Sequence, residues 1–225
     1  MDVIELGTGA DYRETWALQR RLHGEVAAGE RGSTVVLLEH ASVYTAGTST
    51  RPEDLPADGS PVVEVDRGGR ITWHGPGQLV AYPIVALPNA VQVVDWVRRL
   101  EEAVIRTLCD AGLPTRRIAK RAGVWVSDAA GDRKVGQIGV RVTSRVSMHG
   151  VSVNVSNGPE GFAAIHPCGI TDAGVTTLRG ELGDAPPVSE IGRAFAAHLR
   201  PLLDFQRFAS VAVDDPALES EGAAA

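Results

Sequence analysis

The segment Arg67-Gly68-Gly69-Arg70-Ile71-Thr72-Trp73-His74-Gly75-Pro76-Gly77-Gln78-Leu79-Val80-Ala81-Tyr82-Pro83 carries the strongest structural signal in the chain. Residues 71–73 and 79–82 are β-branched, aromatic or aliphatic, which predicts two strands joined by a tight loop. The glycines permit positive φ and close approach of another molecule, and Pro76 stiffens the loop. We expect a rigid wall of free backbone N–H groups with an arginine at one end and a histidine at the other. A glycine-rich hairpin with a surface Arg67 and His74 is the alternative.

Outward from this segment, predicted strands and helices alternate without an obvious linker. Apolar spacing predicts helices over 11–29, from an N-cap at Asn89 to Gly112, and over 189–203. Strands are predicted over 3–6, 34–39, 62–65, 123–127, 134–142 and 149–156, with loops over 40–61 and 157–177. This pattern favours an α/β or α+β fold with helices packed on a mixed sheet. We expect one domain over 1–213 and a frayed tail over 214–225.

Composition excludes several classes of function. The 225 residues are 44% apolar and 22% charged, as in ordinary globular proteins. A net charge of −6 argues against broad nucleic-acid binding. There is no apolar run of about 18 residues, so no membrane helix is expected. The N-terminus does not resemble a signal peptide, and two cysteines make no disulfide framework, so we expect a cytoplasmic protein. The histidines and cysteines lack the spacing of metal ligands, so no metal is expected.

Cys168 is a candidate nucleophile. Pro167 restricts the backbone before it and Gly169 permits a sharp turn after it, which would hold a thiol at a fixed loop position. An inert cysteine is the alternative. Cys109 lies beside the apolar stripe of a predicted helix and is expected at the edge of the core.

A nucleophilic cysteine needs a cation, an imidazole or a helix N-terminus that favours the thiolate. Only two of the 22 basic residues are lysines, Lys120 and Lys134, which marks both for attention. Lys134 begins a predicted strand and is a candidate partner; a surface lysine at a strand end is the alternative. His74, His149 and His166 are rival bases.

Five motifs, in order along the chain, resemble the lipoyl(octanoyl) transferase family. The resemblance runs from about Leu37 to Leu178. Ala41 and Ser42 stand where the family usually has two prolines, and His166 stands where a small or aliphatic residue is common. The motifs are Arg67-Gly-Gly-x-Ile-Thr-x-His-Gly-Pro-Gly-Gln-Leu79 with Tyr82-Pro83, Gly123-Val-Trp-Val126, Lys134-x-x-x-Ile-Gly-Val-Arg-Val142, His149-Gly150 and Pro167-Cys168-Gly169-Ile170.

The resemblance implies the fold of biotin and lipoate ligases, which is like that of class II aminoacyl-tRNA synthetases: a central mixed sheet flanked by helices. It implies that an octanoyl (or lipoyl) group leaves octanoyl-acyl carrier protein for a specific lysine of a lipoyl domain, the first step of endogenous lipoate biosynthesis. The acceptors would be E2 subunits of 2-oxoacid dehydrogenases and the glycine cleavage H protein. Neither a cofactor nor ATP is implied, because the thioester is already activated. We expect a monomer.

The resemblance also implies roles for individual residues. Cys168 matches the acyl-accepting cysteine, and Lys134 matches its acid/base partner. Trp73, Ile138 and Val151 are expected walls of the acyl groove. Backbone N–H groups near Gly75 and Gly77, or at Cys168 and Gly169, are expected donors to the oxyanion. The residues that match substrate-binding segments are Arg67, Gly68, Gly69, Arg70, Ile71, Thr72, Trp73, His74, Gln137, Ile138, Gly139, Gly150, Val151 and Ser152.

Two other functions remain open from the sequence. An ATP-dependent lipoate- or biotin-protein ligase of the same fold would adenylate a free acid and would need no nucleophilic cysteine. A non-catalytic protein that binds lipoyl domains or acyl carriers would form complexes without turnover. For docking of an acidic carrier, the densest basic cluster is Arg116, Arg117, Lys120 and Arg121, with a solvated connection as the alternative.

Overall fold

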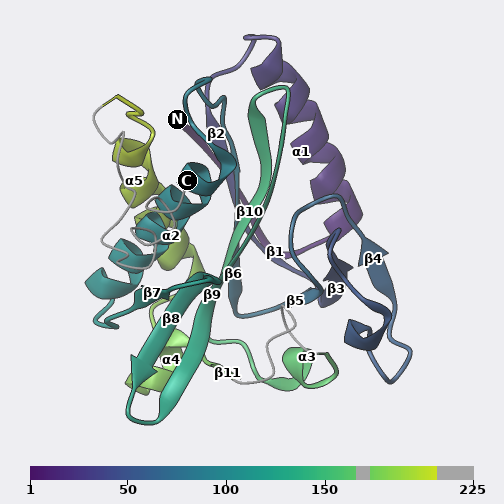
Figure 1. Cartoon of the computed structure of the whole chain (residues 1–225), viewed down its shortest axis with the longest axis vertical. Coiled ribbons are helices and arrows are strands. Elements are labelled where there is room, and N and C mark those ends of the chain that lie inside the picture. The colour runs from purple at the N-terminus through teal and green to yellow at the C-terminus, as the bar shows by residue number, and fades with distance from the viewer. Residues whose placement is uncertain (166–172, 207–225) are drawn as a thin grey trace, which may run out of the picture.

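A central sheet lies between helices in the computed structural model, which describes residues 1–165 and 173–206. Figure 1 shows α1 (Tyr12–Ala27) on one side of the sheet, and α2 (Val93–Asp110) and α5 (Val188–Leu202) on the other. Apolar residues recur at helical spacing along each, so each helix buries one stripe against the sheet. The expected architecture, a mixed sheet flanked by helices, is confirmed.

The strands of the central sheet follow the order β1-β2-β6-β10-β9-β8-β7, with β11 beside β9. The β1/β2 and β11/β9 pairs are parallel and the other pairs are antiparallel. The bounds are Asp2–Ala10 for β1, Thr34–His40 for β2, Gln78–Ile84 for β6, Arg116–Ile118 for β7, Arg121–Asp128 for β8, Gly131–Thr143 for β9, Val146–Asn154 for β10 and Gly174–Val175 for β11.

A second, smaller sheet lies beside the central one, in the order β4-β3-β5. Its strands are β3 (Val43–Ala46), β4 (Val62–Glu64) and β5 (Thr72–His74). Shorter helices are η1 (Pro52–Asp54), α3 (Glu160–Ala163) and α4 (Leu178–Leu182). The predicted loops at 40–61 and 157–177 therefore contain regular structure that their glycine and proline content concealed.

The alternative of a glycine-rich hairpin, in which residues 71–73 would pair with residues 79–82, is wrong. β5 pairs with β3 in the small sheet, whereas β6 pairs with β2 and β10 in the central sheet. The loop between them passes from one sheet to the other instead of closing a hairpin. Gly77, at φ 83°, permits this because an added Cβ would lie 2.5 Å from the Asn157 nitrogen.

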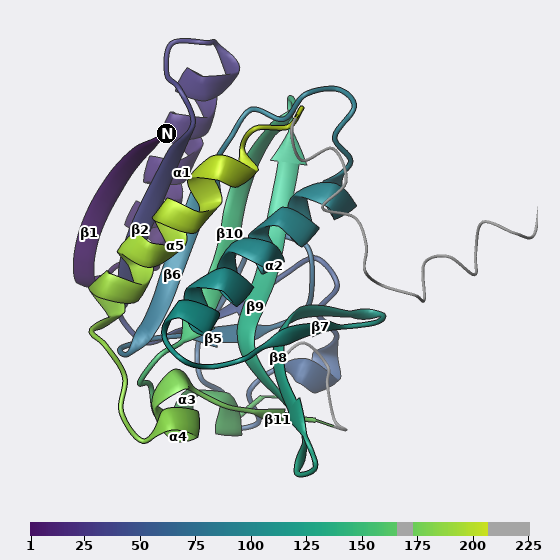
Figure 2. The same cartoon turned by 90° about the vertical axis from the view of Figure 1, so that its left-hand side faces the viewer.

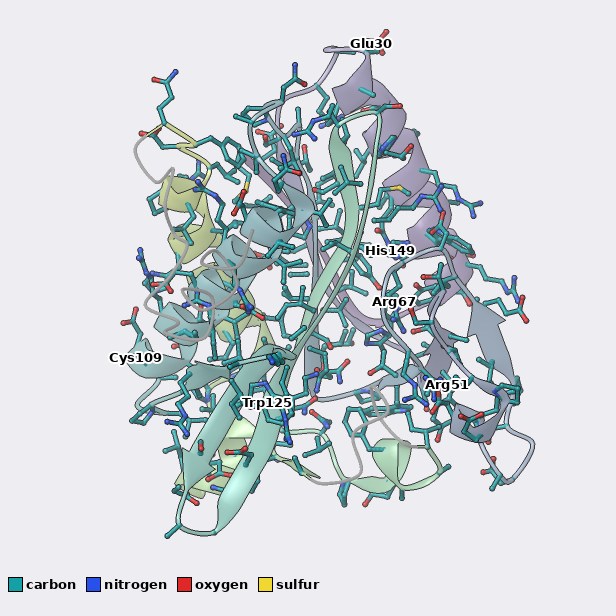
Figure 3. The ribbon with its side chains drawn as sticks, viewed as in Figure 1. Glu30, Arg51, Arg67, Cys109, Trp125 and His149 are labelled. Atoms are coloured by element: carbon teal, nitrogen blue, oxygen red, sulfur yellow. The ribbon has the colours of Figure 1, made fainter. Side chains whose placement is uncertain are left out.

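Two smaller expectations about α2 are also corrected. Asn89 is not its N-cap: the helix is capped at Gln92, whose backbone N–H donates to the Asp95 carboxylate over 3.0 Å. Cys109 is exposed rather than at the core edge, because it follows the buried Leu108 around the helix. It lies on the outer side of α2 (Figure 3).

The two faces of the central sheet carry separate apolar clusters. The larger cluster joins α2 and α5 to the sheet through side chains such as Leu100, Phe195 and Val153. The smaller cluster lies beneath α1 and includes Leu22, Val80 and Ile84. Beyond the N-terminal end of α1, this second face opens into a cavity.

Candidate active site

The cavity has a volume of about 260 Å³, slightly below the range of about 300–1,000 Å³ that is typical of drug-sized ligands. Its floor is formed by β9, β10 and β6, and its walls by α1, β8 and the segment before β5. It is lined by Tyr12, Arg67, Gly69, Arg70, Thr72, His74, Tyr82, Lys120, Arg121, Ala122, Lys134, Gln137, Ile138, Gly139, His149, Gly150, Val151 and Ser152.

Most of the predicted site residues meet in this one cavity, although they come from three separate segments of the chain. Those that line it are Arg67, Gly69, Arg70, Thr72, His74, Lys134, Gln137, Ile138, Gly139, Gly150, Val151 and Ser152. Gly68, Ile71 and Trp73 do not. Cys168 lies outside the described residues, together with His166, Pro167 and Gly169.

Trp73, an expected wall of the groove, packs elsewhere. Its ring meets Phe162 edge-on, with centroids 5.4 Å apart, and its Nε1–H donates to Ser42 over 2.9 Å. Ile71 and Ile165 complete this small apolar cluster. Trp73 therefore anchors the chain immediately before residue 166 instead of facing the cavity.

Lys134 reaches the cavity because of a β-bulge. On the β8/β9 ladder, Trp125 pairs with Lys134 and Val124 pairs with Gly136, so Val135 is an extra residue on β9. The bulge reverses the alternation of side chains, so that Lys134 lies on the cavity side with Gln137. Without it, these two residues would lie on opposite faces of the sheet.

The Lys134 side chain is buried, with 4% exposure, and its Nζ lies 5.1 Å from the centroid of the Trp125 ring. No carboxylate pairs with it within residues 1–165 and 173–206. An added Cβ on Gly123 would come within 2.4 Å of Lys134 Cε, so this glycine makes room for the lysine. A buried ammonium without a carboxylate is ready to pair with an incoming anion.

The chain returns to Lys134 after the segment that holds Cys168. β11 pairs in parallel with β9, with Val175 opposite Lys134, and the Thr176 N–H donates to the Lys134 carbonyl over 2.9 Å. Cys168 is six residues before Gly174 along the chain.

Gln137 presents an unpaired donor to the cavity. Its Oε1 accepts a hydrogen bond from the Ser152 hydroxyl over 2.7 Å, which fixes the orientation of the amide. Its Nε2 is buried and has no hydrogen-bond partner among the described residues. Because a buried unpaired amide is costly, this group is suited to a carbonyl oxygen of a bound molecule.

The two predicted arginines serve the architecture. Arg67 is buried and its guanidinium donates to the carbonyls of Gly68, Arg70 and Thr45. Arg70 forms an ion pair with the buried carboxylate of Asp54. Arg67, the arginine expected at one end of the loop, therefore acts as a clamp that holds the backbone of this segment in shape.

The loop between β5 and β6 does not offer the expected oxyanion donors. The Gly77 N–H donates to the Glu39 carboxylate over 2.7 Å, and neither Gly75 nor Gly77 lines the cavity. Gly75 is needed for space, since an added Cβ would lie 2.1 Å from the Trp73 ring.

A chain of hydrogen bonds closes the inner end of the cavity. Burial lowers the pKa of His40 to about 4, so its ring is neutral. His40 donates from Nδ1 to the Ala10 carbonyl over 2.9 Å, and its Nε2 accepts from the Tyr82 hydroxyl over 2.8 Å. Burial raises the pKa of Tyr12, which bonds to Tyr82, to about 12. Both phenols therefore stay protonated.

His74 is also neutral, because complete burial lowers its pKa to about 3. Its Nδ1 donates to Gln78 Oε1 over 2.8 Å, and Gln78 in turn donates to Asn154. This network fixes the tautomer, leaving Nε2 as an acceptor. At this pKa His74 is unsuited to the role of a base near neutral pH.

His149 reaches the cavity through an unusual backbone conformation, with φ at 56°. Its ring lies 6.1 Å from Trp16 of α1, whereas Val151, two residues on, packs in the larger cluster on the other face. Its Nε2–H donates to Asp66 over 2.8 Å, and burial lowers its pKa. Figure 3 shows His149 close to Arg67, with Trp125 farther along the sheet.

Tyr12 and Tyr82 line the cavity and were not among the predicted site residues. Tyr82 stands in the opening segment, where strand alternation gave no means of choosing its face. Tyr12 begins a helix far from every motif, and no sequence signal marked it. In the described ranges, no group of three or more His, Cys, Asp or Glu side chains could hold a metal ion. No helix in the same ranges is long and apolar enough to span a bilayer.

Comparison with known proteins places the chain in a known family. The model of the lipoyl protein ligase A/B catalytic domain matches residues 11–200, so the chain belongs to this family. A biotin protein ligase from Aquifex aeolicus has the same fold, with a TM-score of 0.55 and 14% sequence identity. The match covers 92% of this chain and 71% of the ligase chain.

A bipartite lipoate protein ligase from Thermoplasma acidophilum, studied with its E2 lipoyl domain, gives a TM-score of 0.67 at 14% identity, covering 90% of this chain and 83% of that one. Among curated relatives, an octanoyltransferase from Pseudarthrobacter chlorophenolicus is 53% identical over 192 residues, covering 84% of this chain and 86% of the relative. The protein is accordingly an acyltransferase that transfers octanoyl groups.

Proposed function

We propose that the protein takes an octanoyl group from octanoyl-acyl carrier protein and transfers it to a specific lysine of a lipoyl domain through a thioester on Cys168. The acceptors are the lipoyl domains of E2 subunits and the glycine cleavage H protein. The ligase studied with an E2 lipoyl domain supports this acceptor class. In this proposal residues 1–213 act as one catalytic domain, and neither ATP nor a cofactor takes part.

In the first step, the Cys168 thiolate attacks the carbonyl carbon of the donor thioester. A new carbon–sulfur bond forms, the bond to the carrier sulfur breaks, and the Lys134 ammonium gives a proton to the departing thiolate. In the second step, the neutral acceptor amine attacks the Cys168 thioester. The carbon–nitrogen bond forms, Cys168 leaves as thiolate, and Lys134 takes the proton from the amine.

The observation that carries this proposal is the placement of Lys134. Its ammonium is buried in the cavity without a carboxylate partner among the described residues, and an ammonium in that state favours a thiolate beside it. The chain that follows Cys168 rejoins the sheet at Val175, opposite Lys134. Because Gly174 follows Cys168 by only six positions, the connecting chain is short enough to keep the cysteine within reach of this end of the cavity.

The acyl chain has a groove in this proposal. Gly139 and Gly150 are opposite each other on β9 and β10, so no side chain rises from this part of the floor. The amide of Gln137 donates to the acyl carbonyl oxygen as negative charge develops there.

Intact-protein mass spectrometry tests the proposal. Incubation with octanoyl-acyl carrier protein should add one octanoyl group to the wild-type chain and none to Cys168→Ala. A parallel run with ATP and free octanoate should add nothing. Modification of an acceptor lysine by Cys168→Ala at the wild-type rate would refute the thioester intermediate.

A further inference from the structure

The two lysines of the chain meet at one cavity. Of the 22 basic residues, all except Lys120 and Lys134 are arginines, and these two lysines both line the cavity described above. Lys134 belongs to its interior, whereas Lys120 is exposed at its rim. The role of Lys120 is not explained by the acyl-transfer chemistry.

Lys120 occupies a backbone position that disfavours it. Ile118 pairs with Arg121, so Ala119 and Lys120 form a two-residue turn between β7 and β8. Lys120 has φ of 63°, a conformation that glycine or asparagine usually supplies. The hairpin of β7 and β8 reaches out from the body of the sheet (Figure 2). A lysine at this position is not explained by the stability of the turn.

Neighbouring arginines are engaged with carboxylates or hydroxyls of the chain itself. Arg117 donates to Glu101 and Glu102, at 3.1 and 2.9 Å, and is only 24% exposed. Arg116 donates to the Ser127 hydroxyl. Of the basic cluster expected to dock a carrier, Arg117 therefore stabilises the fold.

Lys120 differs from these arginines. Its side chain is exposed, and within residues 1–165 and 173–206 no carboxylate pairs with it. Arg121, next in the chain, lies 4.0 Å from Asp132 and 5.7 Å from the centroid of the Trp125 ring. Lys120 thus extends a positive charge toward solvent at the entrance to the cavity, on a chain whose net charge is −6.

We propose that Lys120 is a docking contact for an acidic surface of the protein that delivers the acyl thioester. The inference rests on the proposed function, since it needs a donor carried by an acidic protein. The overall negative charge repels such a donor, and an unmatched cation at the rim offsets this repulsion where the thioester must enter. A need for charge at that point accounts for a lysine in this strained turn position.

The test compares Lys120→Asn with Lys120→Asp. Both replacement side chains are short and tolerate positive φ, so the backbone of the turn is kept and only the charge differs. With octanoyl-acyl carrier protein at low salt, we expect kcat/KM to fall about 2- to 5-fold for Lys120→Asn, the range of an exposed ion pair. The loss of kcat/KM should be larger for Lys120→Asp. The kcat/KM of Lys120→Asp should also depend less steeply on salt concentration than that of the wild-type chain. Lys120→Arg should restore the wild-type rate.

Three donors identify the contact: octanoyl-acyl carrier protein, octanoyl-phosphopantetheine and octanoyl-pantetheine. Loss confined to the protein donor supports docking of an acidic surface. Loss that extends to octanoyl-phosphopantetheine would instead assign Lys120 to the phosphate, and loss with all three would place it in the acyl site. No loss with any donor would also overturn the inference.

Arg200→Gln is the matched control, because it removes one exposed charge from α5, on the opposite face of the sheet. It should leave transfer from all three donors unchanged. The wild-type chain separates this inference from the proposed function. If the wild-type chain uses octanoyl-pantetheine, and Lys120→Asp uses octanoyl-acyl carrier protein at the wild-type rate, the docking inference is refuted and the proposed function stands. If wild type forms no Cys168 thioester from any donor, the proposed function fails first.

Discussion

The two faces of the central sheet are built on different principles. The face against α2 and α5 is dominated by a large apolar cluster, with Leu100, Phe195 and Val153 fully buried. Much of the face beyond α1 is polar, and it buries Lys134, Gln137 and the hydrogen-bonded side chains of His40, Tyr82 and Tyr12. One face provides stability through burial; the other depends on hydrogen bonds and encloses a cavity.

The same strands serve both faces. On β9, Val135 and Val140 pack against the helices while Gln137 lies in the cavity. On β10, Val151 packs in the apolar cluster and the Ser152 hydroxyl holds the Gln137 amide. The comparison teaches that substitutions on alternate residues of one strand should separate stability from activity.

The largest effect is expected at Lys134. Lys134→Arg keeps the positive charge but cannot release a proton near neutral pH, so octanoyl transfer should fall by about 10²–10⁴-fold. Steady-state kinetics with a small octanoyl thioester measure this loss, and thermal unfolding checks that the fold survives. A wild-type rate in Lys134→Arg would rule out proton transfer by this residue.

On the apolar face, Phe195→Ala should destabilise the protein by about 3–5 kcal/mol, because it leaves a cavity in a fully buried cluster. Urea unfolding measures the change. The folded fraction should retain its specific activity. Arg193→Ala, on an exposed position of the same helix, serves as a control and should change stability by less than about 0.5 kcal/mol. A comparable loss in both variants would contradict the assignment of this face to stability.

On the cavity face, Gln137→Met removes the unpaired donor and keeps the length of the side chain. If the amide stabilises the oxyanion, kcat should fall by about 100-fold, as for the loss of one such donor. Ser152→Ala should cause a smaller loss, because the amide remains but is no longer held. Rapid-quench measurement of Cys168 acylation would show the effect directly. An unchanged acylation rate in Gln137→Met would remove Gln137 from the chemistry.

Two glycines of the β8/β9 hairpin provide a matched pair. Gly123 and Gly131 both have positive φ, 115° and 108°, so alanine should strain the backbone at each by about 1–3 kcal/mol. Only at Gly123 would the new Cβ collide with Lys134; at Gly131 nothing lies within 4 Å. Transfer should fall about tenfold in Gly123→Ala alone, since a 1 Å displacement can cost up to about 100-fold. Equal activity in the two variants would show that Lys134 tolerates displacement.

The last prediction concerns the pH dependence of stability. Because burial lowers the pKa values of His40 and His74 to about 4 and 3, the unfolded chain binds protons more readily than the folded chain below about 6.5. Stability should therefore be greatest above pH 6.5 and should fall toward pH 4, by up to about 1.4 kcal/mol per pH unit for each histidine. Thermal unfolding across this range measures the slope. His40→Gln should reduce it, and an unchanged slope would mean that other groups dominate.

The sequence by itself determined the long elements of the fold and indicated most of the residues that meet in the cavity. Apolar periodicity located the three long helices and most strands of the central sheet, because burial on one face imposes a period that is visible in the chain. The scarcity of lysine marked Lys134 and Lys120, and both line the cavity. The ordered motifs pointed to the family that the comparisons established.

Only the tertiary structure decided which side chains face one another. Alternation is a local rule, and it places Lys134 and Gln137 on opposite faces; the bulge at Val135 arises from the pairing with β8 and brings them together. Positive φ at His149 likewise turns its ring toward α1. The assignment of β5 and β6 to separate sheets, and of Arg67 to a clamp, depends on residues distant in the chain. Contacts of that kind leave no periodic trace in the sequence.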